Sequence, residues 1–160
     1  MNEYNFLHND HIDYLQGEMR PALEHYFLKL FDYEHALRGP RDNDLPRKEV
    51  LNRIRRVVDK VDYAIFAIPK NEDGQTRGIL VTDRECPDTI SLLWVNEAFR
   101  SQQLGQQLIA EFQKVRPGRI LHVEVAKFNP RAKAFYERLG FQFDEFESIT
   151  SGVVKGHRIP

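Results

Sequence analysis

The sequence of 160 residues has one cysteine, Cys86, and no disulfide can form within the chain. It also lacks the cluster of cysteine and histidine residues that a structural zinc site needs. No apolar run approaches about 18 residues, and the N-terminus is polar and acidic instead of basic and then apolar. We therefore expect a cytoplasmic protein with no metal, no signal peptide and no membrane-spanning helix.

No charge of one sign dominates the composition. The 23 Lys and Arg residues and the 24 Asp and Glu residues leave a formal net charge of -1. Because no strong positive field surrounds the chain, neither nucleic acid nor an anionic membrane is an expected partner. The chain has no internal repeat or low-complexity segment, and its length is typical of one domain. The sequence therefore predicts a single domain.

The hydrophobic period changes from helical to strand-like along the chain. Residues 1–60 predict a short strand at 4–8 and then helices, with a kink or break near Pro21 and a new helix starting at Pro46. The later strands are predicted at 61–68, 77–82, 89–95, 120–125, 141–146 and around 153–154, and the later helices at 101–114 and 130–139. This order predicts an α/β domain whose mixed sheet has about six or seven strands, with helices on both faces.

A buried strand runs through a short polar loop into a helix within residues 93–107. The first backbone N–H groups of a helix lack internal partners and, together with the helix dipole, favour a phosphate or pyrophosphate. Arg100 adds a positive charge at this junction. Taken alone the junction is weak evidence, because most strand-to-helix junctions bind nothing.

A second segment carries a more specific pattern. An apolar strand is followed by Asn-x-x-Ala-x-x-x-Tyr-x-x-x-Gly-Phe, with its named positions at Asn129, Ala132, Tyr136, Gly140 and Phe141. Together with the upstream strand, Arg100 and Gly105, this pattern resembles the GNAT acyl-CoA-dependent N-acetyltransferases. The resemblance covers about residues 61–146 and implies that these form a CoA-binding core. It implies a variable acceptor-side region at 1–60 and a C-terminal strand and tail at 147–160.

The resemblance implies acetyl transfer from acetyl-CoA to a primary amine by direct attack in a ternary complex. It implies that the strand aligns the pantetheine arm and that the loop and helix start hold the pyrophosphate. The residues implied for CoA binding are Leu93, Trp94, Val95, Arg100, Ser101, Gln102, Gln103, Leu104, Gly105, Gln106, Asn129, Lys133 and Tyr136.

The loop that is implied to hold the pyrophosphate, here called the phosphate loop, has two positions at which the family usually carries a small residue. Gln103 stands where the family usually has its first glycine, and its Cβ disfavours a positive φ. Gly105 keeps the second glycine position, where a larger side chain would obstruct the pyrophosphate. The side chain of Trp94 is expected to serve packing.

Proton transfer is assigned to Tyr136 and Glu124. The resemblance implies that Tyr136 faces the sulfur, and a phenol can protonate the leaving thiolate at neutral pH. Glu124 lies in the middle of a predicted buried strand, where a carboxylate needs a partner or a function, and it is our candidate base. His122, two residues earlier on the same face, is a second candidate. The alternative for Glu124 is a structural ion pair with Arg119 or Lys127 at an exposed edge.

Other polar residues near this pattern have two interpretations each. Asn129 can cap a helix as well as bind the pantetheine arm. One of Arg131, Lys133 and Arg138 can reach the 3′-phosphate of CoA, or all three can be surface charges.

Two functions stay open from the sequence: an N-acetyltransferase, or a catalytically degenerate acyl-CoA-binding or regulatory module of the same fold. The acceptor is open among small amines, antibiotics, peptide N-termini and lysine side chains. Exposed strand edges and aromatic residues such as Phe143 and Phe146 predict a homodimer.

Overall fold

The computed structural model describes residues 3–70, 74–144 and 152–160. The strands in these ranges are β1 (Tyr4–Asn9), β2 (Val61–Pro69), β3 (Gly78–Asp83), β4 (Thr89–Ile90), β5 (Leu92–Val95), β6 (Leu121–Ala126), β7 (Gln142–Phe143) and β8 (Val153–Arg158). The helices are α1 (Ile12–Gln16), α2 (Arg20–Arg38), α3 (Arg47–Val58), the 3-10 helix η1 (Glu97–Gln102), α4 (Leu104–Val115) and α5 (Pro130–Arg138).

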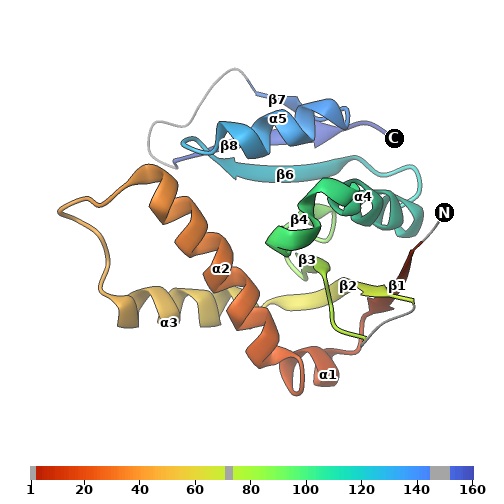
Figure 1. Ribbon diagram of the computed structural model, residues 1–160, viewed down its shortest axis with the longest axis horizontal. Coiled ribbons are helices and arrows are strands. Elements are labelled where there is room, and N and C mark those ends of the chain that lie inside the picture. The colour runs from red at the N-terminus through yellow and green to blue at the C-terminus, as the bar shows by residue number, and fades with distance from the viewer. Residues whose placement is uncertain (1–2, 71–73, 145–151) are drawn as a thin grey trace.

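The described strands form two sheets of four strands each, in the orders β1-β2-β3-β5 and β4-β6-β8-β7 (Figure 1). All pairs in the first sheet are antiparallel, whereas β4 lies parallel to β6 in the second. The predicted mixed α/β fold is therefore confirmed. The strands do not form one continuous ladder, however, because the predicted strand 89–95 is divided between the two sheets.

The division falls at Ser91. Before it, Ile90 of β4 is paired with Val123 of β6. The Ser91 N–H then donates to the Val81 carbonyl oxygen at 2.9 Å, and β5 continues as the partner of β3. Because consecutive segments of the chain pair with different sheets, β5 and β6 diverge. Among the described strands, β5 pairs with β3 alone, so its edge toward β6 is left without a ladder.

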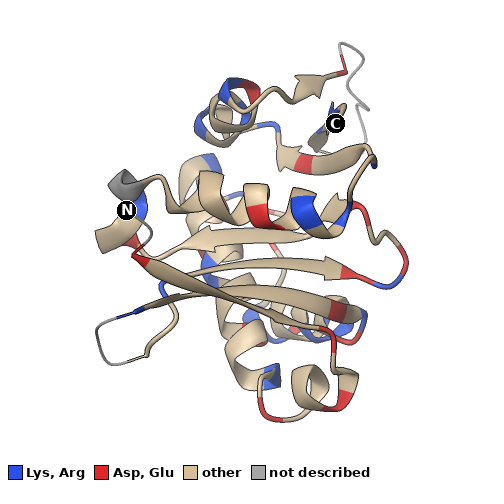
Figure 2. Cartoon of the chain, turned by 90° about the vertical axis from the view of Figure 1, so that its right-hand side faces the viewer, with Lys and Arg blue, Asp and Glu red and all other residues tan. Residues whose placement is uncertain are grey.

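Helices cover both faces of the first sheet, as predicted. On α4, Leu104, Leu108 and Phe112 lie four residues apart and are completely buried against one face. Full burial of such a side chain stabilises the fold by roughly 1.5–3 kcal/mol. Helices α1, α2 and α3 pack their apolar sides on the opposite face (Figure 2). Each helix therefore follows the hydrophobic period of its sequence.

Several element boundaries differ from the sequence-based expectation. The predicted break near Pro21 is confirmed, since α1 ends at Gln16 and α2 begins at Arg20. The helix predicted from Ser101 begins at Leu104, because η1 precedes it. The weak strand predicted around 153–154 is the full strand β8, which pairs with all of β6.

The predicted strand 141–146 contains β7, and its last two residues lie outside the described residues. Most of the predicted turn at 71–74 also lies outside them. Within the described ranges, no helix combines the length and the apolar character needed to cross a membrane.

Candidate active site

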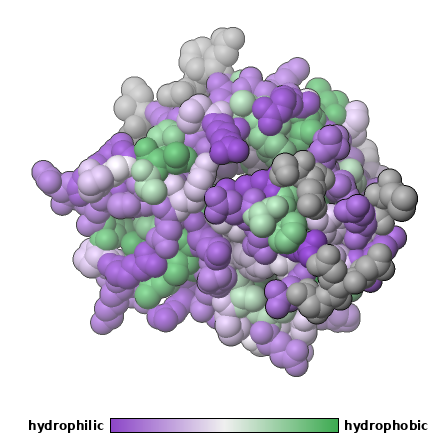
Figure 3. All heavy atoms as spheres, in the orientation of Figure 1, coloured by the Kyte–Doolittle hydropathy of each residue, from purple (hydrophilic) through white to green (hydrophobic). Residues whose placement is uncertain are grey.

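Two cavities meet where β5 and β6 diverge. The β5–α5 cavity, of about 260 Å³, is bounded by β5, the start of α4 and α5. The β4–β6 cavity, of about 410 Å³, is bounded by β4, β6, α2 and α3. Five residues line both cavities: Leu30, Leu93, Asn129, Ala132 and Tyr136. The space-filling view shows a hollow between the β6–α5 segment and η1 (Figure 3). The structure thus brings the predicted Asn129 and Tyr136 to the junction of two cavities.

The strand β5 places Leu93, Trp94 and Val95, three of the residues predicted to bind CoA, along the β5–α5 cavity. Its antiparallel partner β3 occupies one edge of the strand. Backbone groups on the other edge are not engaged by a neighbouring strand among those described, so, apart from the Val95 carbonyl oxygen that accepts from Arg100, they are available to an extended ligand. This edge fits the pantetheine arm that the sequence pattern implies.

The predicted phosphate loop ends in an unusual backbone conformation. Gln103 has φ 58° and ψ 22°, and among the described residues it alone has a positive φ without being glycine. The first intrahelical bond joins Gln107 N to Gln103 O at 3.1 Å, so the N–H groups of residues 104–106 lack intrahelical partners. The loop therefore adopts the left-handed turn that glycine would favour, despite the Cβ of Gln103.

Replacing Gln103 with glycine is expected to raise the free energy of unfolding by about 1 kcal/mol, because the left-handed conformation strains residues with a Cβ. Chemical denaturation measures the change. The control is Gln106→Gly in the first turn of α4, which should lower stability by roughly 0.5–1 kcal/mol because glycine disfavours a helix. Equal losses in both variants would show that Gln103 carries no strain.

Gly105 is buried, and its position has a packing reason that the sequence did not reveal. A Cβ at this residue would lie 3.0 Å from Cζ of Phe135 and 3.8 Å from Cδ2 of Leu93. Glycine therefore lets the start of α4 approach the Phe135 ring of α5 closely. A larger residue at this position would therefore crowd the Phe135 ring as well as the predicted pyrophosphate.

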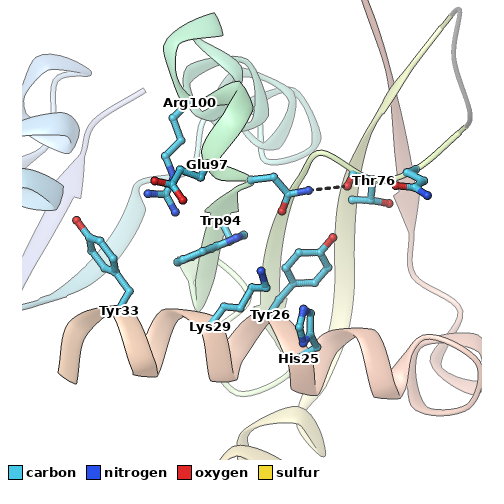
Figure 4. A pocket seen from close by; sticks show the side chains of 10 residues that line it. His25, Tyr26, Lys29, Tyr33, Thr76, Trp94, Glu97 and Arg100 are labelled. Carbon is cyan, nitrogen blue, oxygen red and sulfur yellow. Dashed lines mark hydrogen bonds between the residues drawn. The ribbon is translucent and has the colours of Figure 1, made fainter. Parts of the chain in front are cut away.

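Arg100 is held at the edge of the β5–α5 cavity. Its Nε donates to the Val95 carbonyl oxygen at 3.0 Å. Its guanidinium lies over the rings of Trp94, at 4.8 Å from the centroid, and Tyr33, at 5.6 Å. Figure 4 shows Arg100 reaching from η1 toward Tyr33 of α2 at the border of a third cavity, of about 620 Å³. Trp94 therefore packs as expected and also positions the arginine.

Two further arginines, Arg131 and Arg138, line the β5–α5 cavity. The predicted Lys133 does not, because its Nζ lies over the Phe143 ring at 5.8 Å from the centroid. Its position does not support the predicted contact with a CoA phosphate. Ser101 and Gln102 belong to η1, and their side chains are outside the described part of the structure.

Tyr136 projects from α5 into the junction of the cavities and is 7% exposed. Its ring packs against Phe135 and Phe141, with centroids 5.1 and 5.3 Å away. Its hydroxyl has no hydrogen-bond partner among the described residues. Burial raises the pKa of the phenol, and the charge of Glu34 adds to the rise. The hydroxyl is therefore a protonated and unengaged donor.

Asn129 serves as the predicted helix cap, since its Oδ1 accepts from the Ala132 N–H at 3.1 Å. Its Nδ2 donates to Oε2 of Glu34 on α2 at 3.4 Å. Burial raises the pKa of Glu34, although the hydrogen bond from Asn129 acts in the opposite direction. Sequence reasoning missed Glu34, because nothing in the sequence of α2 distinguishes it from the other acidic residues there.

The expectation that Glu124 is buried is wrong. The strand β6 alternates, and Glu124 points to the exposed face with 54% of its side chain accessible. Its ion-pair partner is Lys155 of β8 at 4.0 Å, whereas Arg119 pairs with Asp88. Glu124 still lines the β4–β6 cavity, but His122 does not.

Comparison with known protein families identifies the family to which this chain belongs. Residues 62–143, just over half of the chain, match the sequence model of the acetyltransferase (GNAT) domain. The chain therefore belongs to the GNAT acetyltransferase family and is an acyltransferase. A comparison with curated proteins finds no match.

Solved structures of low sequence identity share the fold. PaiA N-acetyltransferase from Thermoplasma acidophilum, in complex with coenzyme A, has a TM-score of 0.65 at 11% identity over 98% of this chain and 99% of that one. Apo-form YjaB from Escherichia coli has a TM-score of 0.62 at 16% identity over 96% and 95%. Arabidopsis thaliana NAA60, in complex with a bisubstrate analogue, has a TM-score of 0.57 at 15% identity over 97% and 98%.

Proposed function

We propose that the protein transfers an acetyl group from acetyl-CoA to a primary amine by direct attack in a ternary complex. The observation that carries this proposal is the position of Tyr136. The side chain is buried, and its hydroxyl, which has no partner among the described residues, lies where two cavities meet, so that the thioester end of the cofactor can lie on one side of it and the acceptor amine on the other.

The residues of the β5–α5 cavity fit coenzyme A. The free edge of β5 suits the amide groups of the pantetheine arm, and the open N–H groups at the start of α4 suit the pyrophosphate. Arg100, Arg131 and Arg138 add three positive charges around this cavity. Because guanidinium groups bind phosphates in bidentate fashion, one of the two arginines of α5 suits the 3′-phosphate.

Within this complex the protein has three tasks. The β5 backbone holds the thioester and offers an N–H to its oxygen as negative charge develops there. The acceptor nitrogen forms its bond to the carbonyl carbon, the carbon–sulfur bond breaks, and Tyr136 donates its proton to the departing thiolate. A carboxylate of the β4–β6 cavity receives the proton from the amine. Glu124 lines this cavity and stays one candidate for that role.

Thiol release from acetyl-CoA in the presence of an amine panel tests the proposal. Turnover dependent on an amine is the expected result. CoA at about 100 times its dissociation constant should also stabilise the fold by about 2.7 kcal/mol, which thermal melting detects. Stabilisation by CoA without turnover on any amine would instead indicate the catalytically degenerate acyl-CoA-binding module.

A homodimer and a cytoplasmic location stay predictions. Phe143, one of the aromatic residues behind the dimer prediction, packs against the core of its own chain, and Phe146 lies outside the described residues. Exposed sheet edges therefore carry the dimer prediction. Light scattering that gives the monomer mass at tens of micromolar would contradict it.

A further inference from the structure

The two cavities carry opposite charge. Among the described residues that line it, the β5–α5 cavity has three arginines and no carboxylate. The described lining of the β4–β6 cavity includes Glu34, Asp83 and Glu124 and contains no lysine or arginine. The boundary between them is the buried residue Tyr136, whose hydroxyl has no hydrogen-bond partner among the described residues. An anion therefore suits one side of this hydroxyl, and a cation suits the other.

The three carboxylates of the β4–β6 cavity differ in how they are engaged. Asp83 accepts the N–H groups of Glu85 and Cys86 at 2.9 Å each and the Ser91 hydroxyl at 3.3 Å. Glu124 is exposed and already faces Lys155. These two carboxylates therefore have structural partners.

Among the described residues, Glu34 has no cationic partner within ion-pair distance, and its side chain accepts a hydrogen bond from Asn129 at 3.4 Å. It lies one helical turn after Leu30, which lines both cavities, so α2 presents Glu34 toward their junction. The other groups around it are Tyr136, Asp83, Glu124 and the Cys86 thiol in the same cavity. Arg53 of α3 lines a neighbouring cavity with Glu34 but forms no ion pair with it.

We propose that Glu34 binds the ammonium group of the acceptor and takes its proton, and that the acceptor is an amine with a second positive charge, such as a diamine. This inference rests on the proposed acetyl transfer and names its acceptor class. The proton passes from the amine nitrogen to Oε of Glu34, while the proton of Tyr136 passes to the thiolate. Bulk water then restores both groups, so no further reactant is needed.

The energetics of Glu34 support a functional role. A carboxylate that is half removed from water without a cation loses solvation, and this raises its pKa. Because the folded state then binds a proton more tightly than the unfolded state, this group favours folding at low pH, and that contribution is lost as pH rises through the raised pKa. Glutamine at this position would keep an oxygen that accepts from Asn129 and would carry no charge. Glu34 therefore costs stability at neutral pH, which an incoming cation would offset.

The test compares 1,6-diaminohexane, hexylamine and 6-aminohexanoate as acceptors for the wild-type protein, Glu34→Gln and Glu24→Gln. Glu24 lies on the same helix but pairs with Arg20 and Arg55 outside both cavities, so it is the matched control. We expect wild-type kcat/KM to be highest for the diamine and lowest for the aminocarboxylate. The steps should be about fivefold or more, as one charge interaction of about 1 kcal/mol gives.

Glu34→Gln should lower kcat/KM about 10- to 100-fold for all three acceptors, because each presents its reacting ammonium group to this carboxylate, with partial recovery at alkaline pH as free amine becomes available. Its CoA-induced melting shift should match wild type, and its own melting temperature at neutral pH should be unchanged or higher. The Glu24 control should keep both the wild-type rates and the wild-type order of acceptors.

The outcomes separate the two proposals. Binding of CoA without turnover on any amine would contradict acetyl transfer itself, and this inference with it. Turnover with the aminocarboxylate as the best acceptor would overturn the inference alone. So would a Glu34→Gln variant that keeps the wild-type rate with all three acceptors. Because the order of acceptors is measured on the wild-type protein, it tests the proposed acceptor class even if the variant is unstable.

Discussion

Tyr136→Phe is expected to lower kcat about 10- to 1000-fold, whereas CoA affinity stays close to that of wild type. The substitution keeps the ring that packs between Phe135 and Phe141 and removes the hydroxyl alone. Without a proton donor the thiolate must leave as an anion within a site that is shielded from water, and this raises the barrier of the chemical step. Single-turnover kinetics separates that step from CoA binding, which calorimetry measures.

Stability and pH dependence sharpen this prediction. The hydroxyl of Tyr136 has no hydrogen-bond partner among the described residues, so its removal should leave the melting temperature unchanged or higher. Since burial and the charge of Glu34 raise its pKa, the phenol stays protonated at alkaline working pH. A fall in rate at moderately alkaline pH should therefore not arise from Tyr136.

The control is Tyr26→Phe, because Tyr26 is a half-buried tyrosine of α2 that lines the cavity near η1 and neither of the two cavities beside Tyr136. It should keep wild-type kcat within about twofold, well below the effect expected for a general acid. If Tyr136→Phe behaves like this control, Tyr136 is a packing residue and the thiolate leaves unassisted.

The sequence predicted the parts of the fold that depend on local period. The four-residue spacing of Leu104, Leu108 and Phe112 predicted the buried side of α4 correctly, because one helix face meets one sheet. It did not predict the division at Ser91, where strand pairing depends on the positions of β3 and β6. A continuous run of strand-forming residues does not show which neighbour each part selects.

The candidate site was also predicted only in part, because local motifs were recognised and contacts between distant segments were not. Tyr136 and Asn129 lie on a short contiguous motif, and the structure brings both to one junction. Glu34 was missed because it is 95 residues from its partner Asn129, and folding alone brings them together. Glu124 was expected to be buried, but alternation in β6 exposes it, because the sequence of one strand does not show which of its faces is covered.

Gly105→Val is expected to lower the free energy of unfolding by about 1–3 kcal/mol, because overpacking displaces neighbouring side chains. A Cβ added at Gly105 would lie 3.0 Å from the Phe135 ring, and valine would add two methyl groups beyond this Cβ. The strain should separate the start of α4 from α5, between which the β5–α5 cavity lies. CoA affinity is therefore expected to fall about tenfold or more, since each 1.4 kcal/mol changes affinity tenfold. Chemical denaturation and calorimetry measure the two effects.

The double variant Gly105→Val with Phe135→Leu distinguishes two reasons for the glycine. If contact with Phe135 is the reason, the smaller leucine should restore both stability and CoA affinity in part, with a coupling energy of roughly 0.5–3 kcal/mol. If valine obstructs the pyrophosphate directly, stability should recover while CoA affinity stays low. Ala110→Val, at an exposed position of α4, accounts for the cost of a β-branched residue in this helix. Full stability of Gly105→Val would contradict the close approach of α4 and α5, because a Cβ 3.0 Å from the Phe135 ring requires that ring to move.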